Sequence, residues 1–122
     1  MERAVFRKSE RLCGDAAIAA LFSGKSKGYT IYPVRAVAGC GVAGAAARVL
    51  VSVPKRRLKL AVDRNRVKRQ LREAYRKNKG LLGPAPGIDL ALLWVGGKPC
   101  DTAEVEGKVA ALLRRVSEGL GL

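Results

Sequence analysis

The sequence predicts an α+β fold, a small sandwich in which helices pack on a sheet in the order α-β-β-α-β-α. Three observations support it. The chain has 122 residues, 48% of them hydrophobic, which suits one ordinary domain with one core. The spacing of apolar residues changes several times between the helical period and strand-like segments. A late apolar run lies between glycines, as in a strand buried on both faces. We therefore expect a single domain over residues 1–122.

The first half of the chain predicts one helix and two strands. A short helix is expected at 15–23, because Ile18 and Phe22 repeat at the helical spacing after Asp15, a possible N-cap. The segments 29–38 and 48–53 are rich in β-branched residues and predict two strands. A Gly/Ala-rich segment at 39–47 separates them. We expect these two strands to form a hairpin.

The second half predicts two helices around a third strand. From Leu60 to Asn78 apolar residues recur at the helical period, with basic residues around the other side. The run at 88–95 is nearly continuously apolar and predicts the central strand. Asp101 and Glu104 resemble a capping box before a closing helix that runs toward Gly119. The apolar positions of the two helices are Val67, Leu71, Ala74 and Tyr75 in the first, and Val105, Val109, Leu112, Leu113 and Val116 in the second.

Charge is the strongest functional signal in the composition. The chain has 24 Lys and Arg against 10 Asp and Glu, a net charge of +14. Half of the basic residues lie between positions 55 and 79, where only Asp63 and Glu73 oppose them. A solvated helix face usually mixes both signs, so this pattern favours a surface for a polyanion. We expect the partner to be a nucleic acid.

Several classes of function are excluded or disfavoured. The chain has no His, which removes Ser-His-Asp and Cys-His catalysis. Cys13, Cys40 and Cys100 form no C-x-x-C pair, so we expect reduced thiols in a cytoplasmic protein. The N-terminal residues lack the apolar region of a signal peptide and no stretch is long enough to cross a membrane, so no membrane partner is expected.

The segment 39–44 spells G-x-G-x-x-G, with Asp63 about 20 residues further on. The full helix that a dinucleotide-binding unit needs after its glycines is missing, so we interpret the glycines as turn residues. Carboxylates are scattered, and we expect neither a small-molecule substrate nor a metal held by protein side chains.

The residues alone leave three functions open. They are a subunit of a ribonucleoprotein enzyme, a structural RNA-binding protein of the ribosomal type, and a DNA-binding regulator that places the basic helix in a major groove. The absence of a two-helix turn before the basic helix disfavours the regulator.

Two strings resemble the protein subunit of bacterial ribonuclease P. They are Arg48–Arg56, RVLVSVPKR, and Lys59–Arg76, KLAVDRNRVKRQLREAYR. The core Arg-Asn-Arg-x-Lys-Arg-x-x-Arg-Glu is highly specific, and weaker similarity extends from Phe6 to about Val95. The resemblance implies the ribosomal-protein-S5-domain-2-like fold with a left-handed crossover between the strands that flank the basic helix. The general rule for parallel strands predicts a right-handed one.

The resemblance also implies the activity. In this family a catalytic RNA with bound Mg²⁺ hydrolyses the phosphodiester that joins the 5′ leader to mature tRNA, so the assembly is an endoribonuclease whose protein supplies no catalytic residue. The implied partners are the ribonuclease P RNA and precursor tRNA. The contact with the catalytic RNA is assigned to Arg64, Asn65, Arg66, Lys68, Arg69 and Arg72, and the contact with the leader to Ile18, Phe22, Ser52, Lys55 and Arg56.

Two positions depart from the family pattern. Ile18 and Ala36 stand where aromatic residues are common. From the residues alone, Ile18 and Phe22 suit the core of the domain better than a stacking surface. The resemblance reverses that interpretation and implies that they lie in a cleft between the first helix and the sheet, which receives the single-stranded leader.

Overall fold

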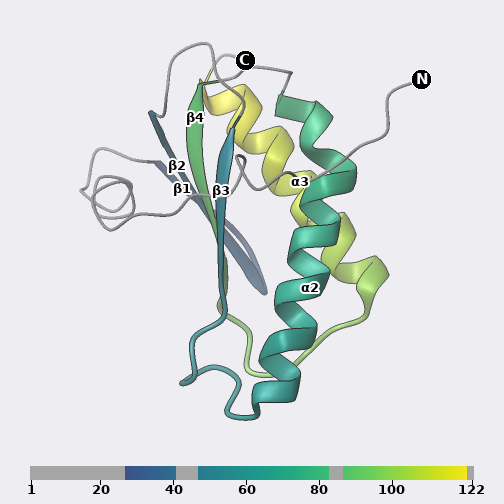
Figure 1. Ribbon diagram of the computed structural model, residues 1–122. Coiled ribbons are helices and arrows are strands. Elements are labelled where there is room, and N and C mark those ends of the chain that lie inside the picture. Colours follow the sequence, from purple (N-terminus) through teal and green to yellow (C-terminus); the bar gives the residue numbers. More distant parts are fainter. Residues whose placement is uncertain (1–26, 41–46, 83–86, 121–122) are drawn as a thin grey trace.

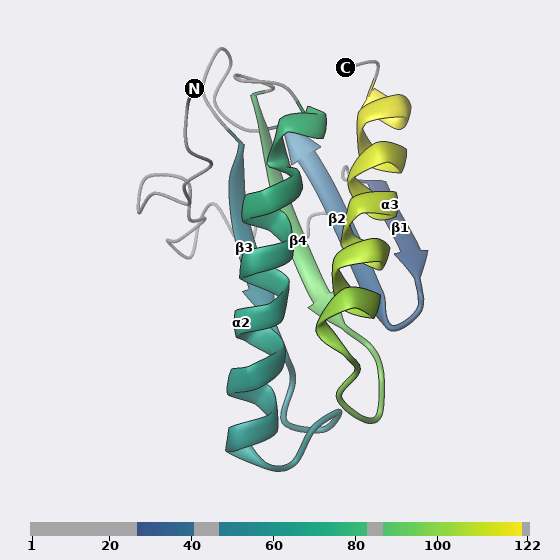
Figure 2. The same ribbon diagram turned by 90° about the vertical axis from the view of Figure 1, so that its right-hand side faces the viewer.

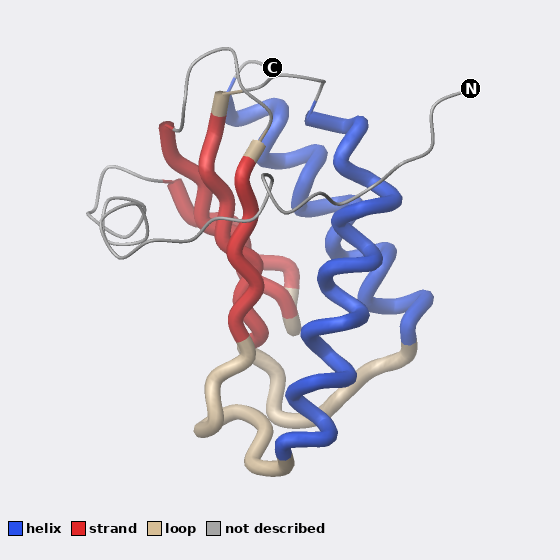
Figure 3. Tube along the Cα trace, in the orientation of Figure 1, coloured by secondary structure: helices blue, strands red, loops and turns tan. Residues whose placement is uncertain are grey.

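In the part of the chain that the structure describes, four strands form one sheet, and two long helices cover one of its faces (Figure 1). The computed structural model describes residues 27–40, 47–82 and 87–120, and the helix predicted at 15–23 lies outside them. The elements in chain order are β1 (Lys27–Ile31), β2 (Val34–Cys40), β3 (Arg48–Ser52), α2 (Ala61–Asn78), a 3₁₀ turn η2 (Lys79–Leu82), β4 (Ile88–Trp94) and α3 (Thr102–Leu120). The α+β sandwich of helices on a sheet is confirmed, as the separate helix and strand layers in Figure 3 show.

The single strand predicted for residues 29–38 is wrong. The chain turns back at Tyr32 and Pro33, so this segment contains two antiparallel strands, β1 and β2, with Tyr29 opposite Ala36. Proline has no backbone N–H and a restricted φ, which suits a turn better than the interior of a strand. The hydrophobic pattern continues across the turn because both strands contribute to the same sheet.

The hairpin predicted between residues 29–38 and 48–53 is also wrong. The strand order is β1-β2-β4-β3, so β4 lies between β2 and β3. Ala91 of β4 is opposite Val37 of antiparallel β2 and opposite Leu50 of parallel β3. Since β4 is apolar on both faces, it gains most from the position with a neighbour on each side. Its predicted place as a buried central strand is confirmed.

The crossover from β3 through α2 to β4 is left-handed. In Figure 2 the helices face the viewer, both parallel strands point downward, and β4 lies to the right of β3. When this view is rotated so that the two strands point upward, β4 lies to the left of β3. The connection through α2 passes in front of the sheet, which makes the crossover left-handed. This agrees with the family resemblance and departs from the usual right-handed rule.

The main core lies between the helices and the sheet. The apolar positions predicted for both helices are all buried, and Trp94 of β4 is fully buried with them. A smaller apolar cluster lies on the opposite face of the sheet, where Val37 and Ala91 pack with Leu50 and Leu93. Among the described residues, no helix is both long enough and apolar enough to span a membrane.

Candidate nucleic-acid interface

The outward face of α2 carries most of the cations that the sequence assigns to RNA. Asn65, Arg66, Arg69 and Arg72 are exposed, and Lys68 is half-buried on the flank. They surround the helix opposite the buried residues because positions three and four apart share a face of a helix. Within the described residues, these side chains come together as one basic stripe along α2. An Arg-rich stripe of this kind matches the charge and the geometry of a phosphate backbone.

Arg64 is placed differently from the rest of this group. It is half-buried, and its Nη1 donates hydrogen bonds to the carbonyl oxygens of Leu58 at 2.9 Å and Lys59 at 2.8 Å. The guanidinium thus contacts the backbone of the loop that leads into α2. The sequence pattern could not distinguish this role from a phosphate contact, because both use the same side chain.

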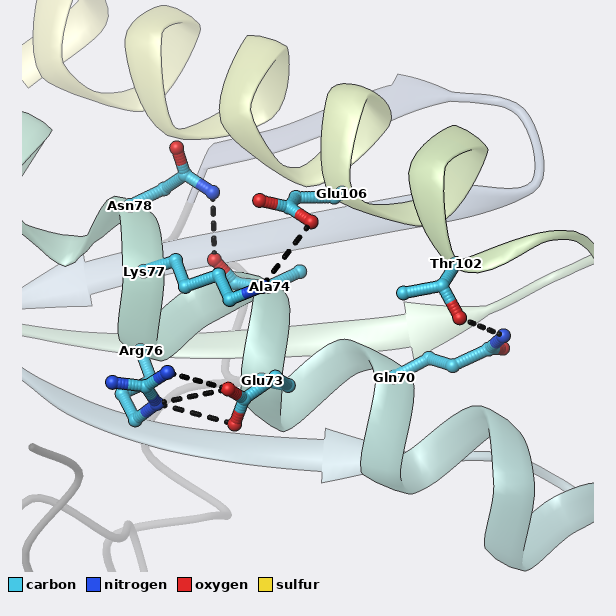
Figure 4. A network of polar contacts seen from close by, with 8 residues as sticks. All are labelled: Gln70, Glu73, Ala74, Arg76, Lys77, Asn78, Thr102 and Glu106. Atoms are coloured by element: carbon cyan, nitrogen blue, oxygen red, sulfur yellow. Dashed lines mark hydrogen bonds and ion pairs between the residues drawn. The ribbon is translucent and has the colours of Figure 1, made fainter.

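Near the C-terminal end of α2, the charge of Arg76 is compensated. Its guanidinium pairs with the carboxylate of Glu73, three residues earlier (Figure 4). The hydrogen bond from Arg76 lowers the pKa of Glu73, and the same bond raises the pKa of Arg76. The Nζ atom of Lys77, the next residue, lies 3.8 Å from Oε2 of Glu106 in α3. The uncompensated part of the stripe therefore ends near Arg72, the last residue assigned to RNA from the sequence.

The side chain of Gln70 connects α2 to the start of α3 through hydrogen bonds. This residue was not selected from the sequence. Its Nε2 donates to the carbonyl of Cys100 at 3.0 Å and to Oγ1 of Thr102 at 3.1 Å. Gln70 is buried at the edge of the apolar face of α2. The sequence does show a polar residue at the edge of the apolar face of this helix. It does not show what Gln70 binds, because its hydrogen-bond partners are some 30 residues away in the chain.

The loop between β3 and α2, residues 53–60, is ordered by its own backbone and by the buried side chains of Val53 and Leu58. The carbonyl of Pro54 accepts hydrogen bonds from the amides of Arg57 at 3.0 Å and Leu58 at 3.3 Å. The side chain of Leu58 is buried in the main core. The exposed side chains of this loop are those of Lys55, Arg56, Arg57, Lys59 and Leu60. Two residues assigned to the leader, Lys55 and Arg56, thus lie in a basic loop beside the start of α2.

Ser52, also assigned to the leader, lies on the sheet face that the helices leave uncovered. It is opposite Leu93 of β4 and, because side chains alternate along a strand, shares a face with Leu50. At the other end of β3, Arg48 pairs with Asp89 through two hydrogen bonds of 2.8 Å. This face therefore combines a short apolar strip with polar side chains at both ends.

Arg35 extends this face and was not selected from the sequence. It is exposed on β2 opposite Leu93, in the same row across the sheet as Ser52. Ala36, where the family commonly has an aromatic residue, is fully buried against the helices and so lies on the other face. Ile18 and Phe22, the remaining leader assignments, lie outside the described residues.

The described carboxylates do not fit a magnesium site. No group of three potential metal ligands comes together in the part of the chain that the structure describes. Glu73 and Asp89 are instead paired with arginines, and Glu106 lies near a lysine.

The fold and this surface define a class of small α+β domain whose positive charge gathers on one helix face and the loop before it. The family model described as Ribonuclease P matches residues 4–117. The chain belongs to the ribonuclease P protein family.

Curated relatives that match this chain are also ribonuclease P proteins. The chain is 51% identical over 77 residues to the ribonuclease P protein component of Porphyromonas gingivalis, a match that covers 62% of this chain and 56% of the relative. It is 40% identical over 106 residues to the ribonuclease P protein component of Chlorobium phaeobacteroides, covering 75% of this chain and 73% of the relative. The match thus spans little more than half the length of the Porphyromonas protein.

Solved structures share the fold. The RNase P protein from Thermotoga maritima superposes with a TM-score of 0.73 at 24% identity, covering 87% of this chain and 96% of the other. The Staphylococcus aureus RNase P protein gives a TM-score of 0.73 at 20% identity, covering 89% of this chain and 96% of the other. At these identities the likeness concerns the fold alone.

Proposed function

We propose that this chain is the protein subunit of a bacterial ribonuclease P, acting as one RNA-binding domain in the cytoplasm. It binds the catalytic RNA and the 5′ leader of precursor tRNA, and so promotes endonucleolytic removal of the leader. The observation that carries this proposal is the basic stripe of α2, which presents Asn65 and Arg66 of the family's Arg-Asn-Arg segment, together with Arg69 and Arg72, on an exposed helix face. Bound Mg²⁺, held mainly by the RNA, would supply the activated water and stabilise the leaving oxygen.

The chain's own residues bind and orient RNA. Arginine forks on the stripe can each grip phosphate through paired hydrogen bonds, and Asn65 adds a donor and an acceptor beside them. The contact with the catalytic RNA lies on α2, whereas the contact with the leader includes Ser52 on the uncovered sheet face and Lys55 and Arg56 in the loop before α2. Binding the leader in addition to the RNA favours precursor over product, since mature tRNA lacks the leader.

The test is cleavage of a precursor tRNA by a bacterial ribonuclease P RNA at low Mg²⁺, with and without this protein. Neutralisation of phosphate charge by the protein should lower the Mg²⁺ that the RNA needs. We expect correct 5′ processing with the protein present and little with RNA alone. Binding to a closely matched RNA without any change in cleavage would favour the structural RNA-binding protein.

The leader assignment has a separate test in Phe22→Ala. If a base stacks on Phe22, we expect this variant to bind leader-bearing precursor more weakly by about 1–3 kcal/mol while binding mature tRNA as before. Fluorescence titration with both tRNAs measures the difference, and circular dichroism checks the fold. Equal losses for both ligands, or unfolding, would place Phe22 in the core.

A further inference from the structure

The basic loop before α2 is ordered by three features, of which the bonds from Arg64 hold it against the helix. The Pro54 carbonyl closes a turn, Leu58 inserts its side chain into the core, and Arg64 binds the carbonyls of Leu58 and Lys59. The third contact differs from the others because it joins the loop to a side chain of α2. It directly precedes the stripe of α2.

The geometry at Arg64 suits a backbone contact better than a phosphate contact. One nitrogen, Nη1, donates to two carbonyl oxygens at 2.8 and 2.9 Å, and the side chain is half-buried. Carbonyl groups that accept from a guanidinium in this way leave fewer of its donors for a ligand. Arg66, two residues further on, is exposed and is therefore the better phosphate ligand.

We propose that Arg64 is a positioning residue that holds the loop of residues 53–60 against α2, so that Arg57 and Lys59 bind RNA phosphate as part of one preformed surface with the stripe. This inference rests on the proposed function and adds two cations to its RNA contacts. A loop that is ordered before binding loses less conformational entropy when RNA arrives. Arg64 thus contributes to affinity through the cations that it positions.

The first experiment uses the free protein and amide hydrogen exchange. Arg64→Met keeps the aliphatic stem and removes the donors, whereas Arg66→Met removes an exposed cation of the same helix as a matched control. We expect the loop amides of Arg57 and Leu58 to exchange about ten-fold faster in Arg64→Met, because loss of the clamp favours local opening. They should be unchanged in Arg66→Met. Equal exchange in both variants would overturn the proposal.

The second experiment measures affinity for a bacterial ribonuclease P RNA by filter binding. The paired substitution Arg57→Gln and Lys59→Gln is made in the wild type, in Arg64→Met and in Arg66→Met. If Arg64 positions the loop, the paired substitution weakens binding much less in the Arg64→Met background than in the wild type. In the Arg66→Met background, its fold-effect should match the wild type, since independent phosphate contacts are additive.

The outcomes separate the proposal from the function on which it rests. Equal fold-effects of the loop substitution in all three backgrounds would show that Arg64 acts as an independent ligand and would overturn its positioning role. A wild-type chain that fails to bind the RNA would contradict the proposed function, and with it the RNA contacts of Arg57 and Lys59. The exchange result in the free protein tests the clamp in either case. Arg64→Lys, whose ammonium can still reach a carbonyl, should recover part of the protection.

Discussion

Two arginines of α2, seven residues apart, differ in what surrounds their charge. Arg69 is exposed on the basic stripe, whereas Arg76 is paired with Glu73. Each cation that neutralises a phosphate releases counterions and contributes to the salt dependence of binding. The free charge on the stripe should therefore contribute more than the compensated one.

We expect Arg69→Ala to lower the slope of log affinity against log salt by about one, and Arg76→Ala to lower it by less. Arg66→Ala should resemble Arg69→Ala. The measurement is RNA affinity over a series of salt concentrations. An unchanged slope for both Arg66→Ala and Arg69→Ala would show that these side chains do not touch phosphate.

Cys100 has a thiol that resists ionisation. Burial raises the pKa of this thiol, and the nearby Glu104 carboxylate raises it further by charge and by a hydrogen bond. Since the thiolate is the reactive form, Cys100 stays protonated and unreactive at neutral pH and becomes reactive only as the pH rises through its raised pKa. In the structure Cys100 forms no disulfide bond.

We expect iodoacetamide to alkylate Cys100 more slowly than free cysteine at pH near neutral. Mass spectrometry of the tryptic peptide of residues 80–108 isolates this thiol from Cys13 and Cys40. Glu104→Gln, which removes the charge, should speed the reaction. A rate equal to that of free cysteine would contradict the raised pKa.

At the scale of the element, α2 works as a two-sided helix. Its inner face packs in the main core and its outer face presents the stripe, while Gln70 joins it to the start of α3. The inner face therefore sets where the outer face points. Substitutions on the two faces should separate stability from RNA affinity.

Leu71→Ala tests the inner face. Leu71 is fully buried, and truncating such a residue leaves a cavity that usually costs about 2–5 kcal/mol of unfolding free energy. Urea denaturation measures the loss. The neighbouring exposed substitution Arg72→Ala should change stability by no more than about 0.5 kcal/mol while weakening RNA binding. A loss below that of Arg72→Ala would show that α2 does not depend on this core contact.

At the scale of the whole molecule, the excess charge opposes folding. A net charge of +14 on 122 residues repels itself, and half of the cations lie in the loop and helix of residues 55–79. Raising the ionic strength from about 0.1 M to about 1 M shortens the screening length from about 10 Å to about 3 Å. Salt should therefore stabilise the free protein even as it weakens RNA binding.

We expect the Tm of the free protein to rise with salt, as measured by circular dichroism. The triple variant Arg66→Gln, Arg69→Gln and Arg72→Gln should show a smaller rise, because three of the repelling charges are gone. Catalytic RNA at 100 times its Kd should stabilise the wild type by about 2.7 kcal/mol at low salt. A Tm independent of salt in both proteins would show that the charges are too well separated to matter.

Local pattern by itself determined much of this protein. The periods of apolar residues predicted α2, β4 and α3 close to their observed bounds, because burying a helix face or a central strand requires that spacing. The basic stripe followed from the same helical geometry. The Arg-Asn-Arg string pointed to the family, which the family match confirmed.

Only the tertiary structure decided which strands pair and what each arginine touches. The turn at Pro33 divides the segment predicted as one strand into β1 and β2. β4 lies between β2 and β3 because pairing with a strand that is distant in the sequence is more favourable here than pairing between strands that follow one another in the chain. The face that Ala36 occupies depends on that register. Arg64 and Gln70 found backbone partners that no spacing rule encodes, since hydrogen bonds to carbonyls depend on where the loops run. The spacing of apolar residues thus determined which face of each helix or strand is buried, and the packing of the elements determined which residues each face contacts.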